Sequence, residues 1–282
     1  MSRALIVGSS SMLGRELVRQ WQSVGDAVIT STRSGECDVP YDLASLQSPP
    51  LADGSVAVVF VCASNFAGDS WDDCIANSLV NTVGMYRIAE WAARLHAAHI
   101  VLASSASAWQ PASSYGLSKA QGEHALQWAS AKAGCKFTAL QFPQLFDDLG
   151  ECGRHQPWFA RIVAYTASGK DLRLAPNDQC RNFLHVCDAA RAMTAASQQG
   201  LEGVHALTTP DFSTYREIAT IAYDVFAAGG QVVEAQDMKP FRPSPYPPAS
   251  EQALALLGGE RVSMRATFER IKALNTASNF AS

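Results

Sequence analysis

Short apolar runs alternate with stretches of helical spacing along the first half of the chain. The apolar runs cover residues 4–7, 27–30, 58–63 and 100–103. Apolar positions spaced as on one face of a helix cover residues 15–21, 74–96 and 115–132. Continuous apolar runs are typical of strands buried on both faces, and their alternation with helices indicates βα units. The pattern therefore predicts an α/β fold with a Rossmann-like, doubly wound parallel sheet.

The second half of the chain is less regular. Residues 147–156 are polar and predict a loop, whereas 158–168 and 264–274 have helical spacing. The nine residues from Pro240 to Pro248 include five prolines, which prevent regular backbone hydrogen bonding. This segment is expected to be an extended loop draped over the substrate pocket. Residues 275–282 are expected to fray.

These elements group into two parts. Residues 1–146 form the Rossmann domain, and residues from about 181 to 200 complete it by returning the chain, from Asn182 to Gln199, to the main sheet. Residues 147–180 and 201–282 are expected to form a small C-terminal α/β subdomain that binds the substrate.

The composition limits the kinds of partner that the chain can bind. The chain has 282 residues, of which 48% are hydrophobic and 17% charged, and its net charge is −4. A chain of this length can form one large core and a satellite subdomain. No basic block, transmembrane-length apolar run or signal peptide is found, so neither a nucleic-acid nor a membrane partner is expected. The six histidines and seven cysteines lack zinc-ligand spacing, so no metal is expected. Scattered cysteines in odd number predict reduced thiols and a cytoplasmic location.

A glycine-bounded turn follows the first apolar run. This strand, turn and helix order is what a dinucleotide pyrophosphate requires, because the backbone approaches closely and the helix N-terminus presents amides to negative charge. A glycine turn also precedes many α/β helices that bind no nucleotide. Ser11 lies midway between Gly8 and Gly14. We expect either that its hydroxyl contacts the phosphate or that the phosphate lies farther from the turn. Cofactor contacts are expected from Gly8, Ser10, Ser11, Met12, Leu13 and Gly14.

The second apolar run ends in Ser31-Thr32-Arg33, with no carboxylate to accept hydrogen bonds from a ribose. Arg33 suits a 2′-phosphate in charge and planar shape, which favours NADP over NAD; the alternative is that Arg33 is a solvated loop charge. Asp42 and Leu43 are expected at the adenine. Ala63, at the exit of the third run, is expected beside the cofactor.

A hydroxyl, a phenol and an amine follow the fourth apolar run. The run leads into Ser104-Ser105-Ala106-Ser107, and the next helical stretch begins Tyr115-Gly116-Leu117-Ser118-Lys119. Tyr115 and Lys119 lie one turn apart on the same helix face. An ammonium group beside a phenol lowers the phenol pKa, so tyrosine can exchange a proton with an alcohol near neutral pH. A Tyr-x-x-x-Lys match alone is weak, and the surrounding motifs decide its meaning.

Together these segments resemble the extended short-chain dehydrogenase/reductase superfamily, which comprises NAD(P)-dependent nucleotide-sugar epimerases, dehydratases and reductases. The likeness extends from about Ala4 to about Leu257. Its most specific part is Arg181-Asn182-Phe183-Leu184-His185-Val186-Cys187-Asp188, which is similar to the family's Arg-Asp-Phe-Ile-His-Val-Asp-Asp. Asn182 and Cys187 replace two of the aspartates.

The resemblance implies catalytic roles. Ser105 is the catalytic serine, Tyr115 the acid/base, and Lys119 the residue that binds the nicotinamide ribose and lowers the tyrosine pKa. Asn81 helps to hold Lys119 through water. Ser107 is a second candidate hydroxyl, and both Ser105 and Ser107 are expected to contact the substrate.

The resemblance also implies contacts farther from the reacting carbon. Arg181 and Arg242 are expected at the substrate diphosphate, although both are ordinary arginines if no nucleotide is bound. Pro143 is expected at the cofactor, in the segment where Gln141-Phe142-Pro143 replaces an Arg-containing strand end. The helices at 74–96 and 115–132 are expected to pair across a twofold axis in a homodimer, or only to cover the sheet.

Three functions stay open on this basis. The leading one is an NADP-dependent oxidoreductase acting on a keto or hydroxyl carbon of a nucleotide-sugar or similar polyol, with NAD as the other cofactor considered. The others are an NAD(P)-dependent nucleotide-sugar epimerase and a non-enzymatic NADP-binding regulator. Dehydration is disfavoured, because Ala106 and Ser107 stand where sugar dehydratases of the family carry an acidic pair.

Overall fold

A computed structural model describes residues 2–50, 54–176, 178–239 and 245–280. The chain divides into two compact units. The first comprises Met1–Phe142, Ala189–Thr208 and Ser244–Gly258, and the second comprises Pro143–Asp188, Thr209–Pro243 and Gly259–Ser282. The units differ from the domains expected at 146 and 181–200, because the strands at 144–146 and 181–185 pair with each other inside the second unit.

The first unit is built on a six-stranded sheet with the order β2-β1-β3-β4-β5-β9, in which every neighbouring pair is parallel. Its strands are β1 (Arg3–Val7), β2 (Ala27–Ser31), β3 (Val58–Val61), β4 (His99–Ser105), β5 (Lys136–Phe142) and β9 (Gly203–Ala206). The four apolar runs of the first half each form one of these strands. The predicted Rossmann-like parallel sheet is confirmed.

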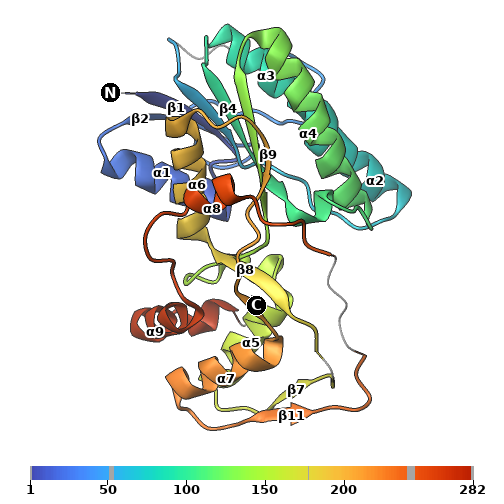
Figure 1. Cartoon of the computed structure of the whole chain (residues 1–282), viewed down its shortest axis with the longest axis vertical. Coiled ribbons are helices and arrows are strands. Elements are labelled where there is room, and N and C mark those ends of the chain that lie inside the picture. The colour runs from blue at the N-terminus through green and yellow to red at the C-terminus, as the bar shows by residue number, and fades with distance from the viewer. Residues whose placement is uncertain (1, 51–53, 177, 240–244, 281–282) are drawn as a thin grey trace. The chain divides into compact units, whose positions relative to one another are not determined.

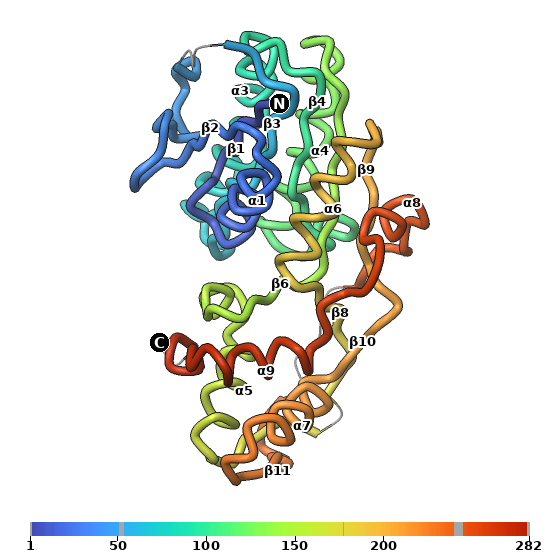
Figure 2. Tube along the Cα trace, turned by 90° about the vertical axis from the view of Figure 1, so that its left-hand side faces the viewer, coloured from blue at the N-terminus to red at the C-terminus, as the bar shows by residue number. Residues whose placement is uncertain are grey.

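Helices cover both faces of this sheet (Figure 1). On one face lie α2 (Trp71–Ser78), α3 (Gly84–Arg94) and α4 (Ser114–Ala133), with a π-helical turn η1 (Leu79–Val83) joining the first two. On the other face lie α1 (Met12–Ser23) and the part of α6 (Val186–Gln199) that belongs to this unit (Figure 2). Trp21 of α1 donates a hydrogen bond to Thr194 of α6 over 3.3 Å. The shorter elements are η2 (Ala106–Ala108) and α8 (Glu251–Ala255).

The core of this unit lies between the sheet and the helices α3 and α4. Leu5, Val59 and Ile100 from three neighbouring strands are completely buried there with Trp91 of α3. Burial of such side chains stabilises the fold by about 1.5–3 kcal/mol each. The core holds the strand ends in fixed register, and the site is built at those ends.

Among its described residues, the second unit contains two small sheets and three complete helices. Its strands are β6 (Gln144–Phe146), β7 (Leu172–Leu174), β8 (Arg181–His185), β10 (Phe212–Ser213) and β11 (Val232–Glu234), in the orders β10-β8-β6 and β11-β7. Its helices are α5 (Pro157–Ala167), α7 (Tyr215–Phe226) and α9 (Met264–Leu274), with 3-10 turns η3 (Glu151–Arg154) and η4 (Ala277–Phe280).

The segment from Asn182 begins in β8, which pairs with β6 and β10, and continues into α6, whose residues from Ala189 on belong to the first unit. The strand β9 then joins the main sheet beside β5. One expectation for this half is wrong. The chain end is not frayed up to residue 280. Phe280 is 3% exposed with its ring centroid 5.9 Å from that of Phe159, and Asn279 donates a hydrogen bond to the Leu149 carbonyl. Residues 240–244, which include Arg242, lie outside the described residues.

Candidate active site

The glycine turn after β1 is as tight as the sequence predicts. Gly8 has a φ of +84°, and a Cβ there would come within 2.3 Å of the Ala63 amide nitrogen. A Cβ on Gly14 would come within 2.1 Å of the Gly8 carbonyl oxygen. Larger residues would therefore push the turn away from β3 and from helix α1. This close backbone approach is the geometry that a dinucleotide pyrophosphate needs.

Ser11 caps helix α1 inside the turn. Its hydroxyl donates to the Gly8 carbonyl over 2.7 Å and accepts from the Gly14 amide over 3.0 Å. Both hydrogen bonds of the hydroxyl are therefore made to the backbone of the turn. The amides of Met12 and Leu13 lie in the first helical turn, where N–H groups have no partner within the helix. Together with the helix dipole they favour an anion at this point, so the residues present fit a pyrophosphate.

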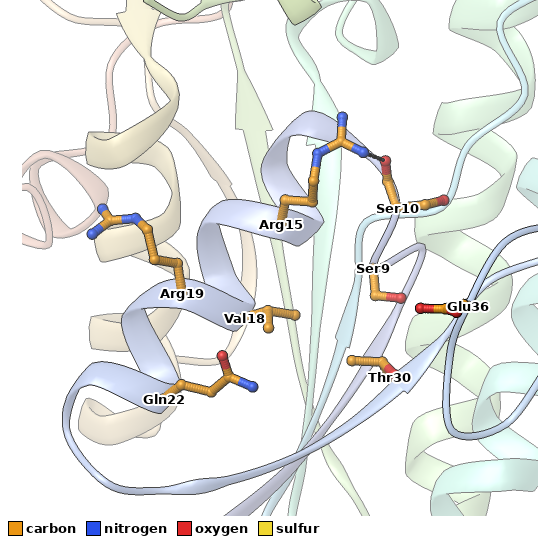
Figure 3. Close-up of a pocket in the computed structure, with 8 residues that line it drawn as sticks. All are labelled: Ser9, Ser10, Arg15, Val18, Arg19, Gln22, Thr30 and Glu36. Carbon is orange, nitrogen blue, oxygen red and sulfur yellow. Dashed lines mark hydrogen bonds between the residues drawn. The ribbon is translucent and has the colours of Figure 1, made fainter. Parts of the chain in front are cut away.

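Polar side chains and arginines surround the end of β2. The Ser10 and Thr32 hydroxyls are 2.6 Å apart, and Arg33 after them is exposed. A neighbouring cavity of about 450 Å³ is bounded by α1, the glycine turn and the loop after β2 (Figure 3). It is lined by Ser9, Ser10, Arg15, Val18, Arg19, Gln22, Thr30 and Glu36. Arg15 donates a hydrogen bond to the Ser10 carbonyl. It brings a second guanidinium group, besides that of Arg33, to the end of β2, and sequence analysis missed it.

Asp42 and Leu43, expected at the adenine, and Ala63, expected beside the cofactor, differ from one another in burial and in hydrogen bonding. Leu43 is 4% exposed and belongs to the hydrophobic core. Asp42 accepts a hydrogen bond from the Ala44 amide over 2.9 Å, within its own turn. Ala63 donates its amide to the Val7 carbonyl and forms the wall of the glycine turn. Of the three, Ala63 is the one that the structure places against the turn.

Tyr115 and Ser105 come together at the end of β4. The strand ends at Ser105, and α4 begins at Ser114 after a cap in which the Ser113 hydroxyl accepts from the Gly116 amide. The side chains of Ser105 and Ser64 lie close enough to the Tyr115 phenol to lower its pKa. The Ser105 hydroxyl also accepts from the Ser107 amide over 3.2 Å. Ser105 at the strand end therefore lies near the phenol, and its pairing with Tyr115 stays a prediction.

Opposing effects act on the Tyr115 phenol. Burial raises the pKa of Tyr115 above its usual value, and the nearby Ser64 and Ser105 side chains oppose that shift. The Phe66 ring lies edge-on to the Tyr115 ring with centroids 4.8 Å apart. Ser64 and Phe66 belong to the loop that leaves β3, and sequence analysis did not single them out. Their position at the carboxyl end of a parallel strand is the signal that could have found them.

Lys119 is buried beneath this site, with 3% of its surface exposed. Its ammonium donates to the Ala103 carbonyl of β4 over 2.8 Å. Burial lowers the pKa of Lys119 to about 8, and the Glu123 carboxylate opposes that shift. The group therefore changes charge close to physiological pH, as expected for a functional amine.

Glu123 lies one helical turn beyond Lys119 and is also buried. Its carboxylate accepts hydrogen bonds from Ser104 and from the Gln141 amide, the latter over 3.0 and 3.1 Å. Burial raises the pKa of Glu123, and its hydrogen bonds and Lys119 oppose that shift. Glu123 is the acidic group beside the lysine, and the four-residue spacing on one helix face could have identified it.

Asn81 ties three segments together from within η1. Its side-chain oxygen accepts from Ser64 and from the Asn65 amide, over 3.1 and 2.9 Å. Its side-chain nitrogen donates to the Asn65 carbonyl and to the Ser118 hydroxyl, over 2.8 and 3.0 Å. Asn81 thus contacts the residue before Lys119 directly. Π-helical turns of this kind occur often at functional sites.

Arg181 belongs to the second unit and is completely buried there. Its guanidinium lies 2.8 Å from the Asp178 carboxylate, donates to the Gln179 carbonyl, and stacks 3.9 Å from the Tyr215 ring centroid. The guanidinium is therefore already surrounded by protein groups. Pro143 is the first residue of the same unit.

The comparisons with known proteins match the same parts of the chain. The model of the NAD-dependent epimerase/dehydratase family matches residues 4–207, which include the glycine turn, Ser105, Tyr115 and Lys119. The chain belongs to this family. Membership identifies it as an NAD(P)-dependent enzyme. No curated protein matches the sequence.

Solved structures of epimerases and of a related NADPH complex share the fold. UDP-N-acetylglucosamine 4-epimerase from Bacillus cereus has a TM-score of 0.75 at 21% identity, over 97% of this chain and 96% of its own. UDP-glucose 4-epimerase from Thermus thermophilus in complex with NAD has a TM-score of 0.71 at 20% identity, over 96% and 99%. RMD from Pseudomonas aeruginosa complexed with NADPH has a TM-score of 0.79 at 15% identity, over 99% of both chains. Identities this low establish the fold alone.

Two negative findings apply to the part of the chain that the structure describes. No group of three or more histidine, cysteine or acidic side chains is placed to hold a metal ion. Over the same residues, no helix combines the length and apolar character needed to cross a bilayer.

Proposed function

We propose that this epimerase/dehydratase-family chain is an NADP-dependent oxidoreductase that transfers a hydride to or from a keto or hydroxyl carbon of a nucleotide-sugar or similar polyol. The observation that carries the proposal is that Ser105, at the end of β4, lies near the Tyr115 phenol, above the buried ammonium of Lys119. The glycine turn, whose backbone fits a pyrophosphate, lies at the same edge of the sheet.

Each group has a distinct task in this proposal. When bound, the nicotinamide supplies the carbon that accepts or donates the hydride. Tyr115 as phenolate takes the proton of the substrate hydroxyl during oxidation, and the phenol returns it during reduction. Ser105 holds the same oxygen. Lys119 binds the nicotinamide ribose and stabilises the phenolate, while Asn81 positions the helix through Ser118.

The cofactor contacts are proposed for residues around the turn and the neighbouring strand ends. Gly8 and Gly14 let the backbone of the turn approach the pyrophosphate closely, and the amides from Met12 onward face it. We retain Asp42 and Leu43 at the adenine. The complete set of proposed cofactor contacts is Gly8, Ser10, Ser11, Met12, Leu13, Gly14, Arg33, Asp42, Leu43, Ala63, Tyr115, Lys119 and Pro143.

An epimerase is the second candidate function, and the names of the structural neighbours favour it. An epimerase oxidises and re-reduces one sugar carbon while retaining its cofactor, so NAD that co-purifies with the protein would support it. A non-enzymatic regulator is disfavoured because the hydroxyl, phenol and amine are all present and close together. Dehydration stays disfavoured, since Ala106 and Ser107 bring no carboxylate to the end of β4.

Arg33 is the residue we propose to select NADP. Arg33→Ala is expected to weaken NADPH binding by about 1.5–3 kcal/mol, the range for a hydrogen bond to a charged group, and to leave NADH binding nearly unchanged. Fluorescence titration with both cofactors measures the effect, with Arg94→Ala on α3 as a control outside the site. Equal losses for the two cofactors would show that Arg33 does not select between them.

The proposed substrate carries a diphosphate that Arg181 and Arg242 help to bind, while Ser105 and Ser107 also contact the substrate. UDP, dTDP, GDP and ADP are added separately while the melting temperature is followed. The right nucleotide at a hundred times its Kd is expected to stabilise the fold by about 2.7 kcal/mol. Arg181→Lys is expected to raise KM for the nucleotide-sugar several-fold with a smaller effect on kcat, because lysine cannot reproduce the two-pronged contact. If no nucleotide shifts the transition and KM is unchanged, a smaller carbonyl compound replaces the nucleotide-sugar.

We also propose a homodimer formed through α2, α3 and α4. Large apolar side chains are exposed on these helices and η1: Trp71, Ile75, Val83, Tyr86, Leu117 and Trp128. Trp128 is 62% exposed, and its ring contacts that of Tyr86. Exposed apolar patches of this kind mark interaction surfaces. Trp128→Glu is expected to convert a dimer into a monomer in light scattering; a monomeric wild-type protein would contradict the proposal.

A cytoplasmic location is retained as a proposal. It is supported by the seven cysteines, all of which are free thiols.

A further inference from the structure

The side chain of Asn77, on α2, is completely buried and makes four hydrogen bonds. Its oxygen accepts from the Asn65 side chain over 2.9 Å and from the Ala67 amide over 3.1 Å. Its nitrogen donates to the Ser114 hydroxyl over 2.8 Å and to the Ala67 carbonyl over 3.4 Å. A side-chain amide has two hydrogens to donate and an oxygen with two lone pairs, so these four contacts use its full capacity. The role of Asn77 therefore follows from the segments that it joins.

Those segments carry two aromatic rings of the candidate active site. Asn65 and Ala67 lie on either side of Phe66 in the loop that leaves β3. Ser114 is the first residue of α4 and directly precedes Tyr115. The rings of Phe66 and Tyr115 meet edge-on with their centroids 4.8 Å apart. One buried side chain thus binds the backbone beside the first ring and the residue next to the second.

Ser114 is fixed to the same loop by two more hydrogen bonds. Its hydroxyl donates to the Gly68 carbonyl over 2.7 Å, and its amide donates to the Asp69 carboxylate over 2.6 Å. The hydroxyl proton is therefore used for Gly68, while a lone pair accepts from Asn77. The first residue of α4 and the loop at residues 65–69 are joined by a continuous set of hydrogen bonds, and Asn77 is its completely buried member.

A second contact of the same kind lies one helical turn away. Asn81 follows Asn77 by four residues. It donates over 3.0 Å to the hydroxyl of Ser118, which follows Ser114 by four residues and directly precedes Lys119. Residues four apart share a helix face, so the two parallel contacts fix the position of α4 along its axis. Asn81 already belongs to the proposed catalytic set, whereas Asn77 has no role in it.

We propose that Asn77 is a positioning residue that holds the Phe66 and Tyr115 rings in their edge-on arrangement and so sets the place of the catalytic phenol. The catalytic part of this role rests on the proposed function, whereas the placement of the rings is a property of the fold. Side chains keep a productive geometry when hydrogen bonds behind them fix their backbone. Phe66 is 59% exposed, so its loop can shift without opening the core. Loss of the Asn77 contacts is therefore expected to displace the rings in a folded chain.

The test places a fluorine atom on the ring at position 115. Fluorotyrosine is incorporated at this position alone in the full-length chain, and its fluorine resonance reports the ring current of Phe66. Phe66→Leu gives the resonance without that ring current. Asn77→Ala and Ser114→Ala are each expected to move the resonance most of the way toward the Phe66→Leu value. Ser114→Thr keeps the hydroxyl that Asn77 contacts, and it is expected to retain the wild-type resonance.

The control is Ser78→Ala, because the Ser78 hydroxyl donates to the Cys74 carbonyl within α2. It is expected to leave the resonance unchanged. Ser114→Ala removes one contact of Asn77 and keeps those to the loop, so it tests the inference if Asn77→Ala does not fold. A wild-type resonance in either variant in its folded state, or an equal displacement in Ser114→Thr, overturns the inference.

Turnover separates this inference from the proposed function. In cofactor-absorbance assays with UDP-, dTDP-, GDP- and ADP-sugars, Ser114→Ala is expected to lower kcat about tenfold or more, since a displacement of about 1 Å can cost a hundredfold. KM for the sugar is expected to stay close to the wild-type value. A displaced resonance with an unchanged kcat would overturn the positioning role. Absent turnover in a wild-type chain whose resonance responds to Asn77→Ala would contradict the oxidoreductase proposal and support the placement of the rings by Asn77.

Discussion

Tyr115→Phe is expected to lower kcat by about a hundredfold to ten-thousandfold, the range for loss of a general acid or base. The substitution removes the hydroxyl that lies near Ser64 and Ser105 and keeps the ring that contacts Phe66. Cofactor affinity is expected to stay close to the wild-type value, because only the proton-transfer group is lost. Steady-state kinetics measure kcat, and fluorescence titration of the cofactor measures its Kd.

Tyr165→Phe is the matched control, since it removes a phenol hydroxyl on helix α5, in the second unit. Its kcat is expected to equal that of the wild type. A Tyr115→Phe enzyme that retains most of its turnover would rule out the acid/base assignment. A variant that loses turnover and cofactor binding together would point to a structural defect, and it would likewise contradict the expected separation.

Lys119→Met is expected to weaken cofactor binding by about 1.5–3 kcal/mol, since the ammonium can no longer donate to the nicotinamide ribose. The pKa of Lys119 is about 8, so the ammonium is charged below that pH and neutral above it. Cofactor affinity of the wild type is therefore expected to fall as the pH rises through about 8. In Lys119→Met this fall disappears, and the pH optimum of turnover moves upward because the phenolate loses its cationic neighbour.

Lys132→Met is the control on the same helix, because Lys132 is exposed near the end of α4. It is expected to bind cofactor as the wild type does at every pH. Cofactor titrations of the wild type, Lys119→Met and Lys132→Met below and above pH 8 test whether Lys119 binds the cofactor. If Lys119→Met binds cofactor like the wild type, Lys119 does not contact the ribose.

The parts of the fold that could be predicted from the sequence depend on local patterns. Four apolar runs mark four strands of the main sheet. The signal is strongest for β1, β3 and β4, because a strand covered on both faces needs apolar residues throughout, whereas the edge strand β2 is partly exposed. Gly8 and Gly14 mark the turn because their lack of a Cβ is visible in the sequence itself. Tyr115 and Lys119 share a helix, so their one-turn spacing predicts their common face.

The parts that could not be predicted depend on contacts between distant segments. Phe66 contacts the Tyr115 ring because β3 and β4 are neighbours in the sheet, and nothing in the local sequence around Phe66 specifies that neighbour. The strand at Arg181 pairs with β6, although its apolar pattern fits any strand. Arg181 itself is sandwiched between Asp178 and the ring of Tyr215 from α7. A motif identifies such an arginine but does not identify the groups that surround it.

Hydride transfer at the Tyr115 site is tested most directly by a single-turnover measurement of cofactor absorbance. The purified chain is mixed with oxidised or reduced NADP or NAD and with UDP-, dTDP-, GDP- and ADP-sugars in turn. The wild type is expected to gain or lose the absorbance of the reduced nicotinamide with one class of sugar, and Tyr115→Phe is expected to show no change in the same mixture. A wild-type protein that binds cofactor and nucleotide-sugar yet leaves the nicotinamide absorbance unchanged in both directions would contradict the account.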